Sequence, residues 1–319
     1  MSIKVTNYLC NLKNEITDTR WDLQGEYELP FVSDESRRFR VKESKNFVTN
    51  VKDPSSRLSV WVKRFMESNS LEVDKKIVNE VLFSRIYNEL GVNAIVTYPC
   101  FFIEPNIQNR FSQSCAKGVV SQDIKAIEQL DTRPLSDKWY PYMYQRKLEN
   151  MLKDKSRLVE REFEVNLNAE LLINNNIVAN VLDLIMLLQD NHFSNKFAIG
   201  KKYNGHEDVV SFDFEDNNLN YKYFYDNIDG FENYPIRSKI IIAREKDETL
   251  RGRLGYIKNL YKEGRLPDGC HSMFRRLANL NIDKLIKDAE SETGYPILKS
   301  EQTDRIRSLV DYNQEFMAK

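Results

Sequence analysis

The spacing of apolar residues changes part-way along the chain, and this change limits the folds that the sequence can adopt. Before residue 125, short β-prone runs such as FVTNV at 47–51 are separated by turns; after it, apolar residues mostly recur every three or four positions, as in amphipathic helices. The chain has 319 residues, of which 41% are hydrophobic, so it can bury a substantial core. The pattern predicts an α+β protein with a small β-rich lobe over residues 1–124 and a larger, mostly α-helical lobe over residues 125–319.

Composition limits the compartment and the partners. The chain carries 47 basic and 48 acidic side chains, so it gives no signal for nucleic acid or an anionic membrane. Its start has no cationic segment followed by a long apolar stretch, and the most apolar run, 182–188, is too short to span a membrane. The cysteines form no close pair and no CxxC motif, which fits a reducing compartment and argues against structural zinc; they are Cys10, Cys100, Cys115 and Cys270. We expect a soluble cytoplasmic protein, although secretion without a cleaved signal is left open.

Several elements can be predicted from the local pattern. The β-prone runs at 39–41 and 47–51 predict a hairpin, and Asp74 and Gly91 are suitable N-cap and C′ residues for a helix between them. Strand-like composition resumes at 95–103 and 118–124. In the second lobe, an apolar helix over 177–188 precedes a predicted hairpin made of 197–199 and 209–212, and three amphipathic helices are indicated around 250–257, 273–280 and 306–310.

A group of oxygen-bearing side chains surrounds the predicted hairpin of the second lobe. Asp190 and Asn195 form a D-x-x-x-x-N motif before it, and Asp213 follows its far strand. Carboxylate and amide oxygens suit Mg²⁺, and phosphoryl transfer needs an aspartate at the attacking hydroxyl together with an asparagine and a second aspartate at the metal. Taken alone, Asp190 and Asn195 are better explained as residues that cap turns.

The first lobe supplies a lysine and a glutamate of the kind that a kinase requires. A kinase uses a strand lysine to contact the α- and β-phosphates and a helical glutamate to hold that lysine. Lys52 ends the run at 47–51, and Glu80 lies on the predicted helix in a half-apolar setting, where an unpaired carboxylate would be costly. The alternative for Glu80 is a surface position on an amphipathic helix.

Four segments resemble the HipA-like serine/threonine kinases of the HipA/CtkA type. LDLIMLLQDNHFSN at 182–195 is similar to the catalytic segment of that family, including the interval of seven residues between Asp183 and Asp190. The other three are RRFRVKESKNFVTNVKDP at 37–54, NEVLFSRIYNELGV at 79–92 and VVSFDFED at 209–216. Together they cover the stretch from residue 31 to residue 216, and the remainder resembles no family.

The resemblance implies a bilobal protein-kinase-like fold that uses ATP and Mg²⁺. It implies that Lys52, and not Lys42, is the phosphate lysine and that Glu80 is its partner, with Asp190 as the catalytic residue and Asn195 and Asp213 as the metal ligands. The resemblance also implies that His192 braces the catalytic loop.

The resemblance further assigns the nucleotide contacts. Ser36 and Arg37 fall in the turn that covers the phosphates, and Ser33 and Ser36 are candidates for autophosphorylation. Gln122 and Ile124 fall in the segment that joins the lobes and meets the adenine.

The function that the sequence indicates is phosphoryl transfer from ATP to serine or threonine of a protein substrate. Two alternatives stay open at this point. One is a catalytically weak kinase-fold module that binds nucleotide and works with a regulatory protein partner. The other is a kinase-fold enzyme that modifies a lipid or small molecule, or that transfers AMP.

Overall fold

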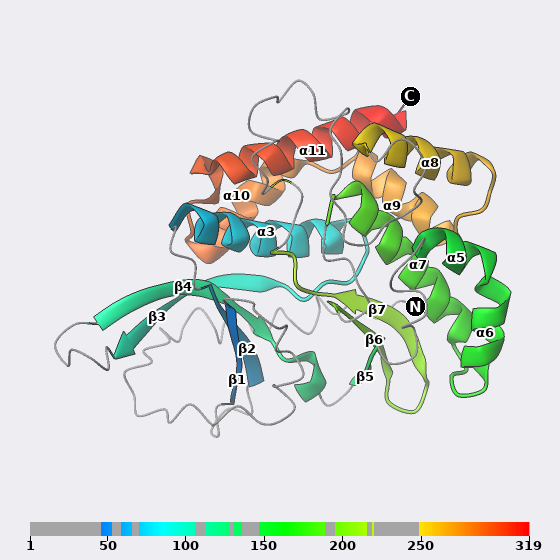
Figure 1. Ribbon diagram of the computed structural model, residues 1–319, viewed down its shortest axis with the longest axis horizontal. Helices are drawn as coiled ribbons and strands as arrows, with labels where there is room; N and C mark the ends of the chain where they lie inside the picture. Colours follow the sequence, from blue (N-terminus) through cyan, green and yellow to red (C-terminus); the bar gives the residue numbers. More distant parts are fainter. Residues whose placement is uncertain are drawn as a thin grey trace.

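The computed structural model of the chain describes residues 46–52, 59–65, 70–105, 113–127, 130–135, 147–188, 195–215, 219 and 249–318. These residues form two small antiparallel sheets and, for the larger part, helices (Figure 1). This mixture of strand and helix agrees with the predicted α+β class. Within the described part, no helix is long and apolar enough to cross a membrane.

The first sheet has four strands in the order β1-β2-β4-β3. They are β1 (Asn46–Lys52), β2 (Ser59–Phe65), β3 (Thr97–Pro105) and β4 (Gln113–Gln122). The predicted strand at 47–51 is therefore present as β1, but the strand it pairs with is β2, which the sequence pattern did not predict. The run at 39–41 lies outside the described residues.

Helix α3 (Ser70–Glu89) crosses this sheet and lies between it and the C-terminal helices (Figure 1). Every residue from 77 to 87 is buried, because one face meets β3 and β4 and another meets α10 and α11. Gly91, with φ of +81°, is the C′ residue: its N–H and that of Val92 return to the Asn88 and Tyr87 carbonyls, as in a Schellman motif. The predicted N-cap is wrong. Asp74 lies inside α3, where its Oδ1 accepts from Lys117 Nζ and the Tyr295 hydroxyl, each at 2.7 Å.

A short 3₁₀ turn, η1 (Ile124–Ala126), leads from β4 toward the second sheet. That sheet has the order β5-β6-β7 and contains β5 (Leu130–Pro134), β6 (Lys196–Lys201) and β7 (His206–Ser211). The predicted hairpin of the second lobe is confirmed as β6 and β7, and β5 is added at its edge.

The remaining helices cover the second sheet and α3. Helix α7 (Ala169–Ile185) contacts β7 and corresponds to the predicted apolar helix, while the three predicted amphipathic helices lie in α8 (Leu250–Lys262), α9 (Asp268–Ala278) and α11 (Glu301–Ala318). Besides β2 and β5, the helical elements of the described part that were not predicted include α5 (Lys147–Lys153), α6 (Lys155–Phe163), α10 (Ile282–Thr293) and the short turn η7 (Ile297–Lys299).

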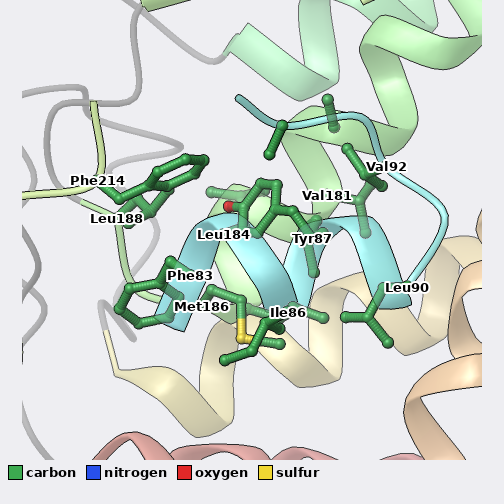
Figure 2. Packing of buried hydrophobic residues seen from close by; sticks show 14 of the residues in the cluster. Phe83, Ile86, Tyr87, Leu90, Val92, Val181, Leu184, Met186, Leu188 and Phe214 are labelled. Carbon is green, nitrogen blue, oxygen red and sulfur yellow. The ribbon is translucent and has the colours of Figure 1, made fainter. Parts of the chain in front are cut away.

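One cluster of buried apolar side chains connects these layers. It runs from Phe65 on β2 through α3 to α7 and the C-terminal helices. Figure 2 shows part of this cluster, with Tyr87 of α3 beside Leu184 of α7, Phe83 of α3 beside Met186, and Phe214 beside Leu188. The same core thus supports the strand end after β7 and the helix that crosses the first sheet. The division at residue 124 stays a prediction.

Candidate active site

The site is built around Lys63, whose ammonium contacts three carboxylates. Nζ of Lys63 lies 3.1 Å from Oε1 of Glu80, 2.6 Å from Oδ1 of Asp213 and 3.0 Å from Oε2 of Glu215. These acids come from different parts of the fold, since Glu80 is on α3 and the other two follow β7. One side chain therefore joins β2, α3 and the segment after β7.

Burial and charge together determine how these groups ionise. Burial alone would lower the pKa of the Lys63 ammonium, but the adjacent carboxylates of Asp213, Glu215 and Glu80 outweigh it and raise that pKa well above its ordinary value. Burial raises the pKa of Glu80 against the opposing effect of Lys63, and for the same reason raises that of Glu215 to about 7. Because burial and the neighbouring carboxylate of Asp213 disfavour the charged forms of Glu80 and Glu215, a cation bound beside them would favour their ionised forms.

The position of Lys63 follows from the order of the strands. β2 is an inner strand beside β4, and α3 contacts β4 and β3, so a side chain on the helix side of β2 reaches Glu80. Phe65, two residues farther along the same strand, is on that side and is buried. Because successive side chains of a strand point to opposite faces, Lys63 lies on the same face as Phe65 and points toward the helix.

The predicted pairing of Lys52 with Glu80 is replaced by the Lys63–Glu80 pair. Lys52 ends β1, which among the described strands is the outer one and lies one step farther from α3, and its backbone is paired with Ser59. Ser59 is four residues from Lys63 along β2, which corresponds to about 13 Å at the usual rise of a strand. The side chain of Lys52 is outside the described part of the chain.

Asp213 follows β7 in an unusual backbone conformation. Its φ is +68°, in the left-handed region that aspartate tolerates better than most residues. The strand end before it is held on one side by Asn93 and Ile95: Ser211 N–H donates to the Asn93 carbonyl at 2.9 Å, and Ile95 N–H donates to the Ser211 carbonyl at 3.0 Å. Asp213 is thereby presented to Lys63 from a fixed position.

The segment after Asp213 is held by a polar chain that begins on the C-terminal helix. Gln302 Nε2 on α11 donates to Asn79 Oδ1 at 2.6 Å, and Asn79 Nδ2 donates to the Glu215 carbonyl at 3.0 Å. Both side chains are buried. Asn79 directly precedes Glu80 on α3, so this contact holds the backbone of Glu215 next to the part of the helix that carries Glu80.

Asn195 lies at the start of β6 and is buried. Its carbonyl accepts from Phe212 N–H at 3.1 Å, so its backbone contacts the residue that precedes Asp213. The predicted metal ligands Asn195 and Asp213 therefore belong to adjacent segments.

The helix that leads toward Asn195 ends in a strained turn. Leu187 has φ of +59°, and the N–H groups of Leu187 and Leu188 return to the carbonyls of Leu184 and Asp183, the pattern of a Schellman motif with leucine where glycine is preferred. A left-handed leucine costs about 1–2 kcal/mol, and such strain is common next to functional sites.

Several predicted site residues fall outside the described part of the chain. These are Asp190, His192, Ser36 and Arg37. Of the residues predicted to join the lobes, Gln122 pairs through its backbone with Val60, and Ile124 is buried at the start of η1. The intervening Asp123 caps η1 by accepting from Lys125 N–H at 3.1 Å.

The residues present fit a divalent cation. One oxygen from each of Glu80, Asp213 and Glu215 lies within 4.8 Å of the others, and the backbone of Asn195 bonds Phe212, which directly precedes Asp213. Hard oxygen donors of this kind suit Mg²⁺, which binds through a few carboxylates and completes its shell with water and phosphate oxygens. The site therefore has a lysine that can bind an anionic group and, next to it, carboxylates that can bind a metal ion.

Sequence comparison finds no relative: no protein-family model matches the chain, and no curated protein matches it. Solved structures do match. The proinflammatory kinase CtkA of Helicobacter pylori is 12% identical, with a TM-score of 0.53 over 86% of this chain and 89% of that chain. The chain has the fold of this kinase. A chain from the complex of HipA, HipB and operator DNA of the Shewanella oneidensis MR-1 toxin–antitoxin system is 10% identical, with a TM-score of 0.43 over 87% of this chain and 63% of that chain.

The CtkA-like fold agrees with the family resemblance of the four segments, and two site residues were missed within it. Lys63 lies in SVWVKRF, whose alternation of large apolar and polar residues is a strand signal that could have identified β2. Glu215 is two residues after Asp213, and only the structure shows its carboxylate at Lys63.

Proposed function

We propose that the chain is an ATP- and magnesium-dependent kinase that transfers the γ-phosphate to serine or threonine of a protein. The observation that carries the proposal is that Lys63 contacts Glu80 and Asp213 at once, at 3.1 and 2.6 Å. A kinase needs its strand lysine held by a helical glutamate beside the aspartate that binds metal. The CtkA-like fold supports the same proposal.

In this proposal each residue has a defined task. Lys63 contacts the α- and β-phosphates, and Glu80 fixes its direction in a site where little water weakens the interaction. Asp213 and Asn195, with Glu215 beside them, hold magnesium, which when bound neutralises charge on the phosphates. Lys63 then exchanges part of its contact with Asp213 for phosphate oxygens.

The catalytic step needs one further group, which the sequence supplies. We assign this task to Asp190, on the motif that ends at Asn195. Asp190 accepts the proton of the serine or threonine hydroxyl, the hydroxyl oxygen forms the new bond to the γ-phosphorus, and the bond between this phosphorus and the β–γ bridging oxygen breaks, so that ADP leaves.

The path of the chain between the two sheets supports the predicted place for adenine. β4 ends at Gln122, and η1 carries the chain to β5 of the other sheet. We therefore propose that the backbone around Gln122 and Ile124 meets the base, with residues 1–124 and 125–319 as the two lobes. Ser36 and Arg37 are proposed to approach the phosphates.

The test is incubation of the purified protein with Mg²⁺ and ATP labelled in either the γ- or the α-phosphate, with a generic protein acceptor and mapping of modified residues by mass spectrometry. We expect transfer of the γ label to serine or threonine, lost in Asp213→Asn and kept in Asp131→Asn, which changes a half-exposed carboxylate on β5. Transfer of the α label would indicate an AMP transferase. Stabilisation by ATP without any transfer would indicate a nucleotide-binding module.

A further inference from the structure

A fully buried polar triad lies beneath the candidate site and links three elements. Oδ1 of Asp183 on α7 accepts from the Tyr87 hydroxyl on α3 at 2.8 Å, and its Oδ2 accepts from Lys196 Nζ on β6 at 2.6 Å. The side chains of Asp183 and Lys196 are 0% and 3% exposed, and Tyr87 is 0% exposed. Burying the charges of Asp183 and Lys196 costs desolvation free energy, which their mutual contact and the Tyr87 hydroxyl have to offset.

The triad joins residues on either side of the predicted catalytic motif. Asp183 lies before this motif, and its carbonyl also accepts from Leu188 N–H at 3.1 Å in the strained turn at the end of α7. Lys196 lies after it and directly follows Asn195. Asp183 therefore contacts both described ends of the stretch between 188 and 195, Leu188 through its backbone carbonyl and Lys196 through its carboxylate.

Tyr87 extends the same network toward the other metal ligand. Its ring meets that of Phe214 edge-on, with 4.9 Å between the centroids, and Phe214 directly follows Asp213 (Figure 2). Tyr87 also lies two helical turns beyond Glu80 on α3. Tyr87 thus bonds Asp183 through its hydroxyl and packs on Phe214 with its ring.

We infer that Tyr87, Asp183 and Lys196 are positioning residues that fix Asn195 against the segment of Asp213, and so set the affinity of the site for a divalent cation. The second part of this inference rests on the proposed function. Hydrogen bonds to a buried carboxylate restrain direction more tightly than apolar packing does, because misalignment leaves a charge without a partner. Lys196 transmits this restraint through one peptide bond to Asn195.

The inference can be tested with a variant in which all three polar groups are removed together, Tyr87→Phe/Asp183→Leu/Lys196→Met. Because no buried charge is then left unpaired, this variant is expected to fold. The matched control is Arg133→Met/Glu162→Leu, which removes a largely buried ion pair of 3.0 Å between β5 and α6, away from Lys63. Tyr87→Phe alone, which keeps the ring contact with Phe214, serves if the triple variant does not fold.

The first readout is hydrogen exchange at two neighbouring amides. Phe212 N–H bonds the Asn195 carbonyl, whereas Ser211 N–H bonds the Asn93 carbonyl. In the triple variant we expect the Phe212 amide to exchange at least about tenfold faster relative to wild type while the Ser211 amide is unchanged, with a smaller change in the same direction for Tyr87→Phe. Wild-type protection of Phe212 in these variants would overturn the inference.

The second readout is the Mg²⁺ concentration that gives half-maximal binding of a non-hydrolysable ATP analogue. We expect a rise of about tenfold in the triple variant, the size typical for loss of residues that orient metal ligands, and none in the control. An unchanged value, or an equal rise in the control, would overturn the inference. If the wild-type protein binds no nucleotide with Mg²⁺, the proposed function fails, and hydrogen exchange still decides whether the triad positions Asn195.

Discussion

Lys63 is the residue on which the site depends, because it is the cation shared by the helix glutamate and the carboxylates after β7. Its interactions need a compact ammonium on a flexible stem, which the planar guanidinium of arginine does not reproduce. Lys63→Arg should therefore keep the charge and the fold but reduce phosphoryl transfer by about 10²-fold to 10³-fold. Rates of transfer from γ-labelled ATP measure this effect.

Lys52→Arg is the matched control for that substitution. The two lysines lie on neighbouring strands of one sheet, and sequence reasoning assigned the phosphate contact to Lys52. Transfer by Lys52→Arg should equal that of the wild type. A loss in Lys52→Arg with none in Lys63→Arg would reverse the assignment.

Asp208 should make the stability of the fold depend on pH. This side chain on β7 is buried, and burial raises its pKa from 3.8 to about 7, although Val209 N–H and Asn93 Nδ2 each donate to it at 2.8 Å. The folded state then binds the proton more tightly than the unfolded state, so this contribution to stability is complete below about pH 4 and is lost as the pH rises through 7.

Asp208→Asn should remove that part of the pH dependence. Over the interval from pH 4 to pH 7, the free energy of unfolding of the wild type should fall relative to the variant by at most about 4 kcal/mol. Urea denaturation at a series of pH values measures the difference, with Asp288→Asn on the exposed face of α10 as the control. Parallel curves for wild type and Asp208→Asn would contradict the prediction.

At this scale the sequence draws attention to the acids more readily than to Lys63. Glu80 was predicted from the cost of burying a carboxylate without a cation, and the structure gives it such a cation. Asp213 was predicted from its place after a strand. The sequence could not choose between Lys52 and Lys63, because both lie on β-prone runs and only the pairing of β1, β2 and β4 determines which strand lies nearer to α3.

Among the elements, α3 and α11 together determine where the segment after Asp213 lies. Asn79 on α3 joins Gln302 on α11 to the Glu215 carbonyl. Farther along α11, Arg305 Nη1 donates to the Leu219 carbonyl at 2.9 Å. The C-terminal helix thus holds this segment directly at Leu219 and, through Asn79, at Glu215.

Asn79→Ala should weaken this connection. Because the substitution leaves buried polar groups without their partner, we expect the free energy of unfolding to fall by about 1–3 kcal/mol. Hydrogen exchange should also increase around Glu215. Ser308→Ala on α11, whose hydroxyl bonds within its own helix, is the control and should change neither quantity.

The predictability of the elements depended on their surroundings. α8, α9 and α11 each keep one apolar stripe, so their spacing was visible in the sequence. α10 is also amphipathic but was not predicted, and α3 is buried on all sides over residues 77–87, so it shows no clear apolar stripe there. Its N-cap was misplaced because Asp74 is used for contacts with Lys117 and Tyr295, which come from distant parts of the chain.

In the whole molecule, the strands of the first sheet depend on helices that come last in the sequence. Arg85 on α3 donates to Glu292 on α10 at 3.2 and 3.0 Å, and the Tyr98 hydroxyl on β3 donates to the same carboxylate at 3.2 Å. Helix α3 lies beside α10 and α11 (Figure 1), and apolar side chains of all three belong to one buried cluster.

A fragment of residues 1–124 should therefore not fold by itself, although the sequence predicts it as a lobe. Without the C-terminal helices, the fragment would expose the apolar side of α3. We expect no cooperative thermal unfolding for the fragment and recovery of a folded complex when residues 125–319 are co-expressed. Cooperative unfolding of the isolated fragment would show that the predicted lobe is an independent unit.

The central claim is that Lys63 meets the phosphates of ATP, and the most direct measurement is labelling with an acyl-phosphate derivative of ATP, which acylates a lysine beside the bound nucleotide. Peptide mapping should find the label on Lys63, and excess ATP with Mg²⁺ should prevent it. Labelling of Lys52 instead, or labelling of Lys63 that ATP does not prevent, would contradict the account.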